Sequence, residues 1–376
     1  MMVEQPMDIA VMEPAVGRQG RPHFDEVVEI AGAFAKAGAR VTVHAHRSID
    51  DAMVARFSQV GADLRPSFTE HDFAPDRTAM LDIEVWRKLI QTTTAEVAEL
   101  PEPDVAFWPA LMPTQAQAIA RAPKGRLIFA GLDGQLNVRG PFSPEIFGDG
   151  AQRMAALGER VVLGAYDHRL VEPYRPFFGD REIIEFPIPY SGAKKAVRET
   201  GSPLRIGILG ALRPERGRSL VPGLVEGLLQ RNLKVVVQSS YMDLPEIPDH
   251  PNLERLDYVD AFPGLVASCD LVLWPSTARL YSYRASGIAW VAIASGVPVV
   301  MPSTCLPAQI TAEYGAASFF HFLQTQFVLR AVDSAVENYA ELSELALSRA
   351  EQWNSWQGPD LLAGKIIEIA RARLAC

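Results

Sequence analysis

The chain has 376 residues, a length that favours two domains at roughly 100–200 residues each. Apolar residues make up 48% and charged residues 22%, which excludes a disordered, collagen-like or coiled-coil protein. The net charge is −9, from 36 basic and 45 acidic residues, so no bulk attraction draws the chain to nucleic acid or to an anionic membrane.

Three cysteines, Cys269, Cys305 and Cys376, lie far apart and form no C-x-x-C pair, so neither a zinc knuckle nor a disulfide framework is indicated. The first residues are acidic rather than basic, which is unlike a signal peptide. The apolar stretch 288–300 is shorter than the roughly 20 residues that span a bilayer. We therefore expect a cytoplasmic protein whose membrane contact is at most peripheral, at the inner face.

Short apolar runs alternate with amphipathic stretches, the pattern typical of βαβ units in a parallel sheet. In the first half we expect strands at residues 8–12, 40–44, 104–108, 126–130 and 160–163, and helices at 25–36, 116–122 and 151–157. Residues 187–203 are rich in Pro, Gly, Ser and charge, which indicates a linker. In the second half we expect strands at 205–209, 234–238, 271–274 and 297–301, and helices at 220–230, 261–268, 286–295 and 361–374.

These elements predict an α/β protein with two Rossmann-like, doubly wound domains that face a cleft. The expected division is a domain over residues 1–188, a linker over 189–203, a second domain over 204–350, and a helical segment over 351–376 that packs back on the first domain. In such sheets ligands bind at the carboxyl ends of the strands. Site residues are therefore expected in the loops that follow the strands.

The loop after the first strand of the second half is rich in glycine and arginine, with the sequence ILGALRPERGR. Gly210 ends the strand, and Arg213 and Arg216 precede a helix, so guanidinium groups and backbone amides converge where an anion binds. Residues 194–234 hold nine basic and three acidic side chains, a local excess of +6 (9 − 3). The loop thus predicts a phosphate site, and the alternative is a solvated, Arg-rich turn.

A second polar loop follows the strand at 271–274 and leads into a helix. It carries Tyr283 and Arg284, and Ser286 stands where it caps a helix that begins at Gly287. A helix N-terminus then faces a strand end, as an anion site requires. The alternative is an ordinary connection between strand and helix.

The second half resembles the donor-binding domain of the GT-B glycosyltransferases, in particular the retaining group typified by family 4. GALRPERG resembles the family's phosphate loop, with Arg216 at the position of the family's Lys. The family's Arg is replaced by Ala211 in this chain, and the resemblance implies that Arg213, two positions on, substitutes for it. ASGVPVVMP resembles its G-x-P-V-V end. The resemblance implies a nucleotide diphosphate sugar as donor, held without a metal or a separate cofactor.

One part of the family pattern is missing. The two Glu of its E-x7-E motif, which contact the donor sugar and the nucleotide ribose in the family, fall on Tyr283 and Val291. Neither side chain is a carboxylate. Sugar and ribose recognition therefore depend on other residues here, or donor binding is weak or lost.

The first half resembles the acceptor domain of the same fold. Gly17 and Gly20 occupy the place of the family's Gly-rich first loop, and His23 stands where the next helix begins. Asp133 and His168 each follow an expected strand, near the place of a polar active-site group in related enzymes. We take His23, Asp133 and His168 as candidate catalytic residues. The alternative roles are helix capping for His23 and turn formation for the other two.

The sequence thus predicts a hexosyltransferase-type glycosyltransferase, retaining and metal-independent, that acts on a nucleotide sugar and on an acceptor hydroxyl of a glycan, glycolipid or small molecule. Two alternatives stay open. A noncatalytic relative would keep the fold as a sugar-binding or assembly subunit, and a sugar-nucleotide 2-epimerase would share the fold. The sequence identifies neither the base, the sugar nor the oligomeric state.

Overall fold

The computed structural model describes residues 5–17, 23–73, 78–134, 140–196, 198, 201–238 and 246–375. The chain divides into two compact units, Met1–Pro189 with Gly358–Cys376, and Tyr190–Gln357. Each unit is a parallel sheet with helices packed on it, so the predicted α/β, doubly wound fold class is confirmed.

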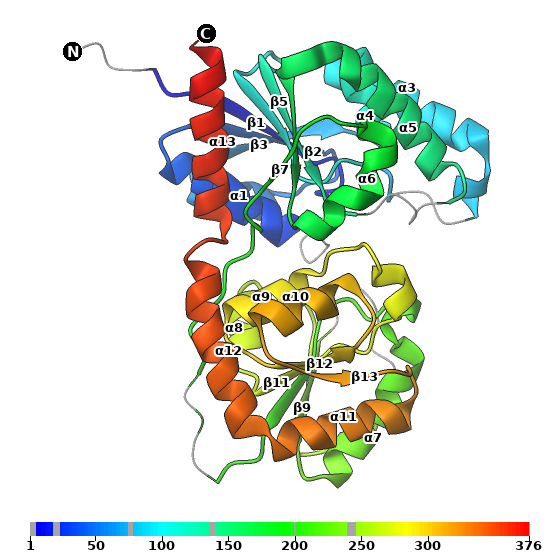
Figure 1. The fold of residues 1–376 in the computed structure, drawn as a ribbon, viewed down its shortest axis with the longest axis vertical. Helices are drawn as coiled ribbons and strands as arrows, with labels where there is room; N and C mark the ends of the chain where they lie inside the picture. Colours follow the sequence, from blue (N-terminus) through cyan, green and yellow to red (C-terminus); the bar gives the residue numbers. More distant parts are fainter. Residues whose placement is uncertain are drawn as a thin grey trace. The chain divides into compact units, whose positions relative to one another are not determined.

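The first unit contains a seven-stranded parallel sheet in the order β3-β2-β1-β4-β5-β6-β7 (Figure 1). Its strands are β1 (Asp8–Met12), β2 (Arg40–His46), β3 (Ala62–Phe68), β4 (Val105–Trp108), β5 (Leu127–Leu132), β6 (Val161–Ala165) and β7 (Ile183–Glu185). Its helices are α1 (Phe24–Lys36), α2 (Asp51–Gln59), α3 (Ile83–Glu99), α4 (Pro113–Arg121), α5 (Ser143–Met154), α6 (Val171–Phe178) and α13 (Pro359–Leu374).

The second unit contains a six-stranded parallel sheet in the order β10-β9-β8-β11-β12-β13. Its strands are β8 (Arg205–Ile208), β9 (Lys234–Gln238), β10 (Leu253–Leu256), β11 (Leu271–Leu273), β12 (Val299–Pro302) and β13 (Ala317–Phe320). Its helices are α7 (Val221–Gln230), α8 (Phe262–Ala267), α9 (Gly287–Ala294), α10 (Leu306–Tyr314), α11 (Thr325–Glu337) and α12 (Tyr339–Asn354).

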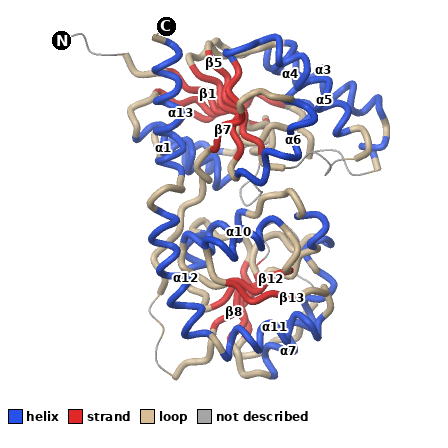
Figure 2. The backbone as a smooth tube through the Cα atoms, in the orientation of Figure 1, coloured by secondary structure: helices blue, strands red, loops and turns tan. Residues whose placement is uncertain are grey.

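The sheet of the second unit is covered on both faces, because its strands present apolar side chains in both directions. Ile206 and Ile208 of β8 pack with α7 and α11 in one core cluster. Val272 of β11 and Val299 of β12 pack with α8, α9 and α10 in another. Figure 2 shows the strands enclosed by helices in this way. Burial on both faces explains why the interior strands of this sheet are mostly apolar.

The strand order reverses once in each sheet, next to the strand that comes first in its unit. β1 lies between β2 and β4, and β8 lies between β9 and β11. Loops leaving the carboxyl ends of such neighbours turn in opposite directions, which opens a crevice where ligands bind in doubly wound sheets. Glu13 follows β1, and Gly210 follows β8, so both loops lie at these points.

Two segments connect the units. Residues 190–203, where the sequence predicts a linker, belong to the second unit, and Ala193 N donates to Ser295 Oγ at 3.1 Å there. After α12 the chain returns to the first unit, where Gly358 N donates to the Ile188 carbonyl at 2.9 Å. Helix α13 then packs beside α1 (Figure 1).

The predicted strands are all present, with ends within two residues of the expected ones. The prediction of a helix at 151–157 is wrong about where the helix begins, since α5 begins at Ser143. Gly148 and Gly150 argue against a helix in the sequence, because glycine normally destabilises a helix. Here a Cβ at Gly150 would lie 2.9 Å from the backbone of Ala116, so the glycine lets α5 approach α4 closely.

Candidate functional site

The loop after β8 brings a guanidinium group over a glycine. Gly210 has a φ of 86°, a conformation that favours glycine, and its N–H donates to Gln238 Oε1 at 2.7 Å. A Cβ at this position would lie 3.0 Å from Arg216 Nη1. The absence of a side chain at Gly210 therefore makes room for Arg216 at the carboxyl end of β8.

The same loop packs against the end of β11. A Cβ at Gly217 would lie 2.4 Å from the Pro275 carbonyl oxygen, so only glycine fits there without a shift. Ser276 follows and is fully buried, and its Oγ has no hydrogen-bond partner among the described residues. A buried hydroxyl without a hydrogen-bond partner costs free energy.

Three arginines gather around one buried tyrosine. Tyr281 is 0% exposed, and its hydroxyl oxygen accepts a hydrogen bond from Arg216 Nε at 3.2 Å. The guanidinium of Arg284 lies over the Tyr281 ring, 5.3 Å from its centroid. Burial raises the pKa of Tyr281, but the charges of Arg216, Arg284 and Arg213 outweigh it, so the pKa is lowered overall. We call Arg213, Arg216 and Arg284 the arginine cluster.

The N-terminus of α9 lies beside this cluster. Ser286 is buried, and its Oγ accepts from Ala289 N at 3.5 Å, which caps the helix. The next residues pack tightly, since a Cβ at Gly287 would lie 2.8 Å from the ring of Tyr190. Ile288 reaches Gly210, because a Cβ on that glycine would lie 2.6 Å from Ile288 Cδ1. The helix dipole therefore adds positive potential near the arginine cluster.

The two positions of the missing carboxylates have different surroundings. Tyr283 is 59% exposed, whereas Arg284, the next residue, is 8% exposed. Val291 is 3% exposed and packs in the core with Trp274 and Ala308. An apolar core side chain of this kind cannot hydrogen-bond a ribose.

In the first unit a buried glutamate follows β1. Glu13 is 2% exposed; its Oε1 accepts from Ala15 N at 3.1 Å, and its Oε2 has no hydrogen-bond partner among the described residues. Burial raises the pKa of Glu13 to about 7, although the positive charge of His23 opposes the shift. Glu13 therefore titrates near neutral pH, which suits a group that handles a proton.

His23 precedes α1 with a φ of 79°, a left-handed conformation that is uncommon outside glycine. Its Nδ1 lies 3.6 Å from Glu26 Oε2. Burial lowers the pKa of His23, but Glu26, Glu13 and Asp133 together outweigh burial and raise the pKa to about 9. His23 is thus an imidazolium at neutral pH, enclosed by the acidic cluster of Glu13, Glu26 and Asp133.

The structure brings two of the three candidate catalytic residues together. Asp133 follows β5, is 6% exposed and lies close enough to His23 to affect its pKa. His168 follows β6 but is 62% exposed and faces Asp167 at 3.8 Å, outside the acidic cluster. Gly17 lies against the end of β2, since a Cβ there would lie 3.1 Å from His46 Cβ, and Ser48 Oγ, beyond the strand, donates to its carbonyl at 2.9 Å. Gly20 lies outside the described residues.

Two residues of these sites escaped sequence reasoning as site residues, Glu13 and Tyr281. Glu13 carried a readable signal, because an acidic residue directly after a buried strand is placed at the ligand-binding edge. Tyr281 stands in the loop 279–284, whose two arginines and two tyrosines favour binding, but its contact with Arg216 joins residues 65 positions apart. Only the fold brings that pair together.

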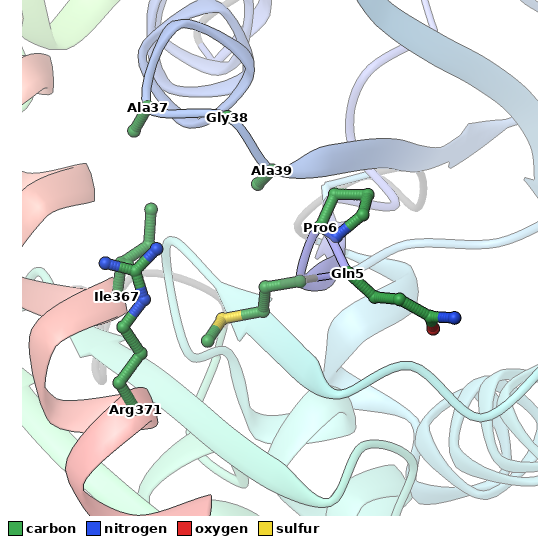
Figure 3. Close-up of a pocket in the computed structure, with 8 residues that line it drawn as sticks. Gln5, Pro6, Ala37, Gly38, Ala39, Ile367 and Arg371 are labelled. Carbon is green, nitrogen blue, oxygen red and sulfur yellow. The ribbon is translucent and has the colours of Figure 1, made fainter. Parts of the chain in front are cut away.

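Other features of the described residues do not mark a site. A cavity of about 220 Å³ lies at the amino ends of β1 and β2, lined by Met7, Ala37, Ile367 and Arg371 among others (Figure 3). No group of three or more His, Cys, Asp or Glu side chains in the described ranges is arranged to hold a metal ion. Within those ranges no helix is both long and apolar enough to cross a bilayer.

No protein-family model matches this sequence, and a comparison with curated proteins gave no match. Solved structures do match. The glycosyltransferase SnogD from Streptomyces nogalater aligns with a TM-score of 0.59 at 17% identity, over 97% of this chain and 100% of that chain. Sucrose-phosphate synthase from Thermosynechococcus elongatus aligns with a TM-score of 0.64 at 12% identity, over 99% of this chain and 100% of that chain. Anabaena HepE in complex with UDP and glucose aligns with 0.57 at 16% identity, over 96% and 99%. At these identities the fold alone is established, and it is the GT-B fold.

Proposed function

We propose that this chain is a glycosyltransferase that moves a sugar, of the hexose class, from a nucleotide diphosphate sugar to an acceptor hydroxyl. The observation that carries the proposal is the arginine cluster around Tyr281, at the strand-order reversal of the second sheet. Guanidinium groups bind diphosphate oxygens through charge-assisted hydrogen bonds. The solved structures of the same fold include HepE with UDP, which supports the nucleotide class.

In the proposed reaction the arginine cluster stabilises the leaving group. The bond between the anomeric carbon and the diphosphate breaks with its electron pair on the diphosphate, so negative charge grows there. Arg213, Arg216 and Arg284 lower the barrier because their attraction strengthens with that charge. The N-terminus of α9 adds to the same field. Cationic side chains thereby take the part that a divalent metal plays elsewhere, and we propose a metal-independent reaction with no separate cofactor.

In the first unit Asp133 and His23 are the proposed groups that bind the reacting hydroxyl of the acceptor. An imidazolium donates hydrogen bonds from both ring nitrogens, and a carboxylate accepts the proton of a hydroxyl. The two groups carry opposite charges and lie close enough for Asp133 to raise the pKa of His23. His168 remains a second candidate at the same edge of the sheet, through its exposed imidazole.

Retention of the anomeric configuration is part of the proposal, and it rests on the resemblance of the second half to the family 4 group. We also propose that the protein acts in the cytoplasm, with at most peripheral membrane contact. Proton NMR of the anomeric centre of a product formed in the presence of EDTA tests retention and metal independence together. An inverted product, or loss of turnover with EDTA, would contradict these finer parts.

A noncatalytic binding subunit is the second candidate function, because Val291 offers no hydrogen bond where the family has a carboxylate. Calorimetric titration with UDP, dTDP and GDP, followed by assays of nucleotide release from the matching sugar donors, separates the candidates. Binding with release supports the transferase, and binding without release supports the noncatalytic subunit. Absence of binding to every nucleoside diphosphate would contradict the transferase and would fit a subunit whose donor site is lost, and free UDP with an epimerised sugar would indicate an epimerase.

A further inference from the structure

Tyr281 is held on three sides. Its ring packs edge-on against Trp274, with centroids 4.7 Å apart at 76°. Its hydroxyl oxygen faces Arg216, and its ring face carries Arg284. The side chain is fully buried, so its orientation is fixed by these neighbours. One phenol therefore contacts two guanidinium groups that come from different loops, after β8 and after β11.

This contact reduces the electrostatic repulsion among the guanidinium groups of the arginine cluster. Like charges repel, and three guanidinium groups in one partly buried place repel more strongly than they would in water. A phenol oxygen accepts a hydrogen bond from one of them, and the negative face of the ring attracts another. Tyr281 thus offsets part of the repulsion while the diphosphate is absent, without adding a permanent negative charge that would compete with it.

We propose that Tyr281 is a positioning residue of the diphosphate site, which fixes the guanidinium groups of Arg216 and Arg284 before the ligand arrives. The inference rests on the proposed function, since it concerns the same site. Pre-organised donors bind an anion more tightly than mobile ones, because less side-chain entropy is lost on binding. Tyr281 touches the arginines and not the reacting atoms, so its effect is on affinity.

The same geometry links diphosphate binding to the ionisation of Tyr281. Burial raises the pKa of Tyr281, and Arg216, Arg284 and Arg213 lower it by more. A bound diphosphate neutralises the field of these arginines, so the pKa of Tyr281 rises on binding. At alkaline pH, where part of the phenol is ionised, binding must then take up a proton.

The first experiment titrates pyrophosphate into the wild type and into Tyr281→Phe, which keeps the ring and removes only the hydroxyl. We expect binding to weaken about tenfold, because a hydrogen bond to a charged group is lost. Tyr339→Phe is the matched control, since it removes a tyrosine hydroxyl of the same unit that bonds Asp270 Oδ1 at 2.7 Å. We expect that control to bind pyrophosphate within about twofold of the wild type.

The second experiment reads the ionisation of the phenol directly. Tyrosinate absorption is recorded across an alkaline pH titration of the wild type and of Tyr281→Phe, each with and without pyrophosphate. Because pyrophosphate itself titrates in this range, the absorption, and not a count of protons, reports Tyr281. We expect pyrophosphate to shift the tyrosinate transition of the wild type to higher pH and to cause no such shift in Tyr281→Phe.

The outcomes separate this inference from the proposed function. Equal pyrophosphate affinity of the wild type and Tyr281→Phe would overturn the inference and leave the function intact. Pyrophosphate binding that leaves the tyrosinate transition of the wild type unshifted would also overturn it. If the wild type bound neither pyrophosphate nor any nucleoside diphosphate, the inference and the proposed function would both be contradicted.

Discussion

The charge of His23 decides what the first unit offers to a substrate. Three carboxylates, those of Glu13, Glu26 and Asp133, keep its ring protonated in a place where burial alone would discharge it. A cation of this kind donates hydrogen bonds rather than accepting a proton at neutral pH. The role that we propose for His23, binding the acceptor hydroxyl, rests on that charge.

The raised pKa of His23 makes folding depend on pH. The folded protein binds the proton up to about pH 9, whereas the ordinary pKa is 6.5, so this contribution to stability is complete below pH 6.5 and lost as pH rises to 9. We expect the wild type to lose about 3 kcal/mol of unfolding free energy across this window.

The matched variant is His23→Asn, because asparagine tolerates the left-handed backbone at this position. Urea unfolding at several pH values measures the difference between the wild type and the variant. We expect a flatter pH dependence between pH 7 and 9 in the variant. Equal slopes for the two proteins would contradict the assignment.

Arg216 is the residue on which the proposed diphosphate site depends most, since it contacts both Gly210 and Tyr281. We expect Arg216→Ala to weaken pyrophosphate binding by about 1.5–3 kcal/mol, the contribution of a hydrogen bond to a charged group. Arg279→Ala is the control, because Arg279 is an exposed arginine of the neighbouring loop. If calorimetry gave the two variants the same affinity, the loss would reflect net charge alone.

At the scale of elements, the loop after β8 depends on a glycine for two separate reasons. Gly210 has a φ of 86°, and its missing Cβ also makes room for Ile288 and Arg216. Gly201 has nearly the same φ, 85°, but nothing lies within 4 Å of a Cβ there. The two glycines share the backbone requirement and differ in the space around them.

We expect alanine at either glycine to cost about 1–2 kcal/mol of stability through left-handed backbone strain. Gly210→Ala should in addition weaken pyrophosphate binding, because the new methyl displaces Arg216. Urea unfolding and calorimetry measure the two effects separately. Loss of pyrophosphate binding in Gly201→Ala, or none in Gly210→Ala, would contradict the described geometry.

The start of α9 depends on its cap. Ser286→Ala removes the hydroxyl that accepts from Ala289 N, and we expect it to cost about 1 kcal/mol of unfolding free energy. Ser282→Ala is the control, since that exposed serine hydroxyl donates to a loop carbonyl instead. A similar loss in both variants, by urea unfolding, would argue against a capping role.

Strands inside the two sheets were predictable and those at the edges were not. The nine predicted strands are all interior, and the four edge strands β3, β7, β10 and β13 were missed. β3 shows why: it carries Asp63, Arg65 and Pro66, side chains that only an edge tolerates. An interior strand is buried on both faces and stands out as an apolar run, whereas an edge strand does not.

At the scale of the whole molecule, the chain leaves the first unit, builds the second and returns. Helix α13 therefore stabilises a unit whose other elements lie far away in sequence, through buried side chains such as Leu362 and Ile366. We expect Ile366→Ala to destabilise the first unit by about 2–5 kcal/mol, and Leu361→Ala, at an exposed position of α13, by much less.

We expect pyrophosphate, the proposed ligand of the second unit, to raise the melting temperature of that unit, so scanning calorimetry with and without pyrophosphate tells the two transitions apart. Ile366→Ala should lower the transition that pyrophosphate does not shift and leave pyrophosphate affinity unchanged. A loss of that affinity would show instead that α13 supports the second unit.

The sequence alone determined what depends on neighbours along the chain. The interior strands follow from local apolar runs, and the Gly–Arg loop and the Ser286 cap follow from residue types at short spacing. The tertiary structure decided which charges meet. Glu13, His23 and Asp133 gather because β1 and β5 lie in one sheet, and Arg216 reaches Tyr281 because β8 pairs with β11. Burial and charge proximity, which set the pKa values and the site chemistry, exist only after the strands are ordered.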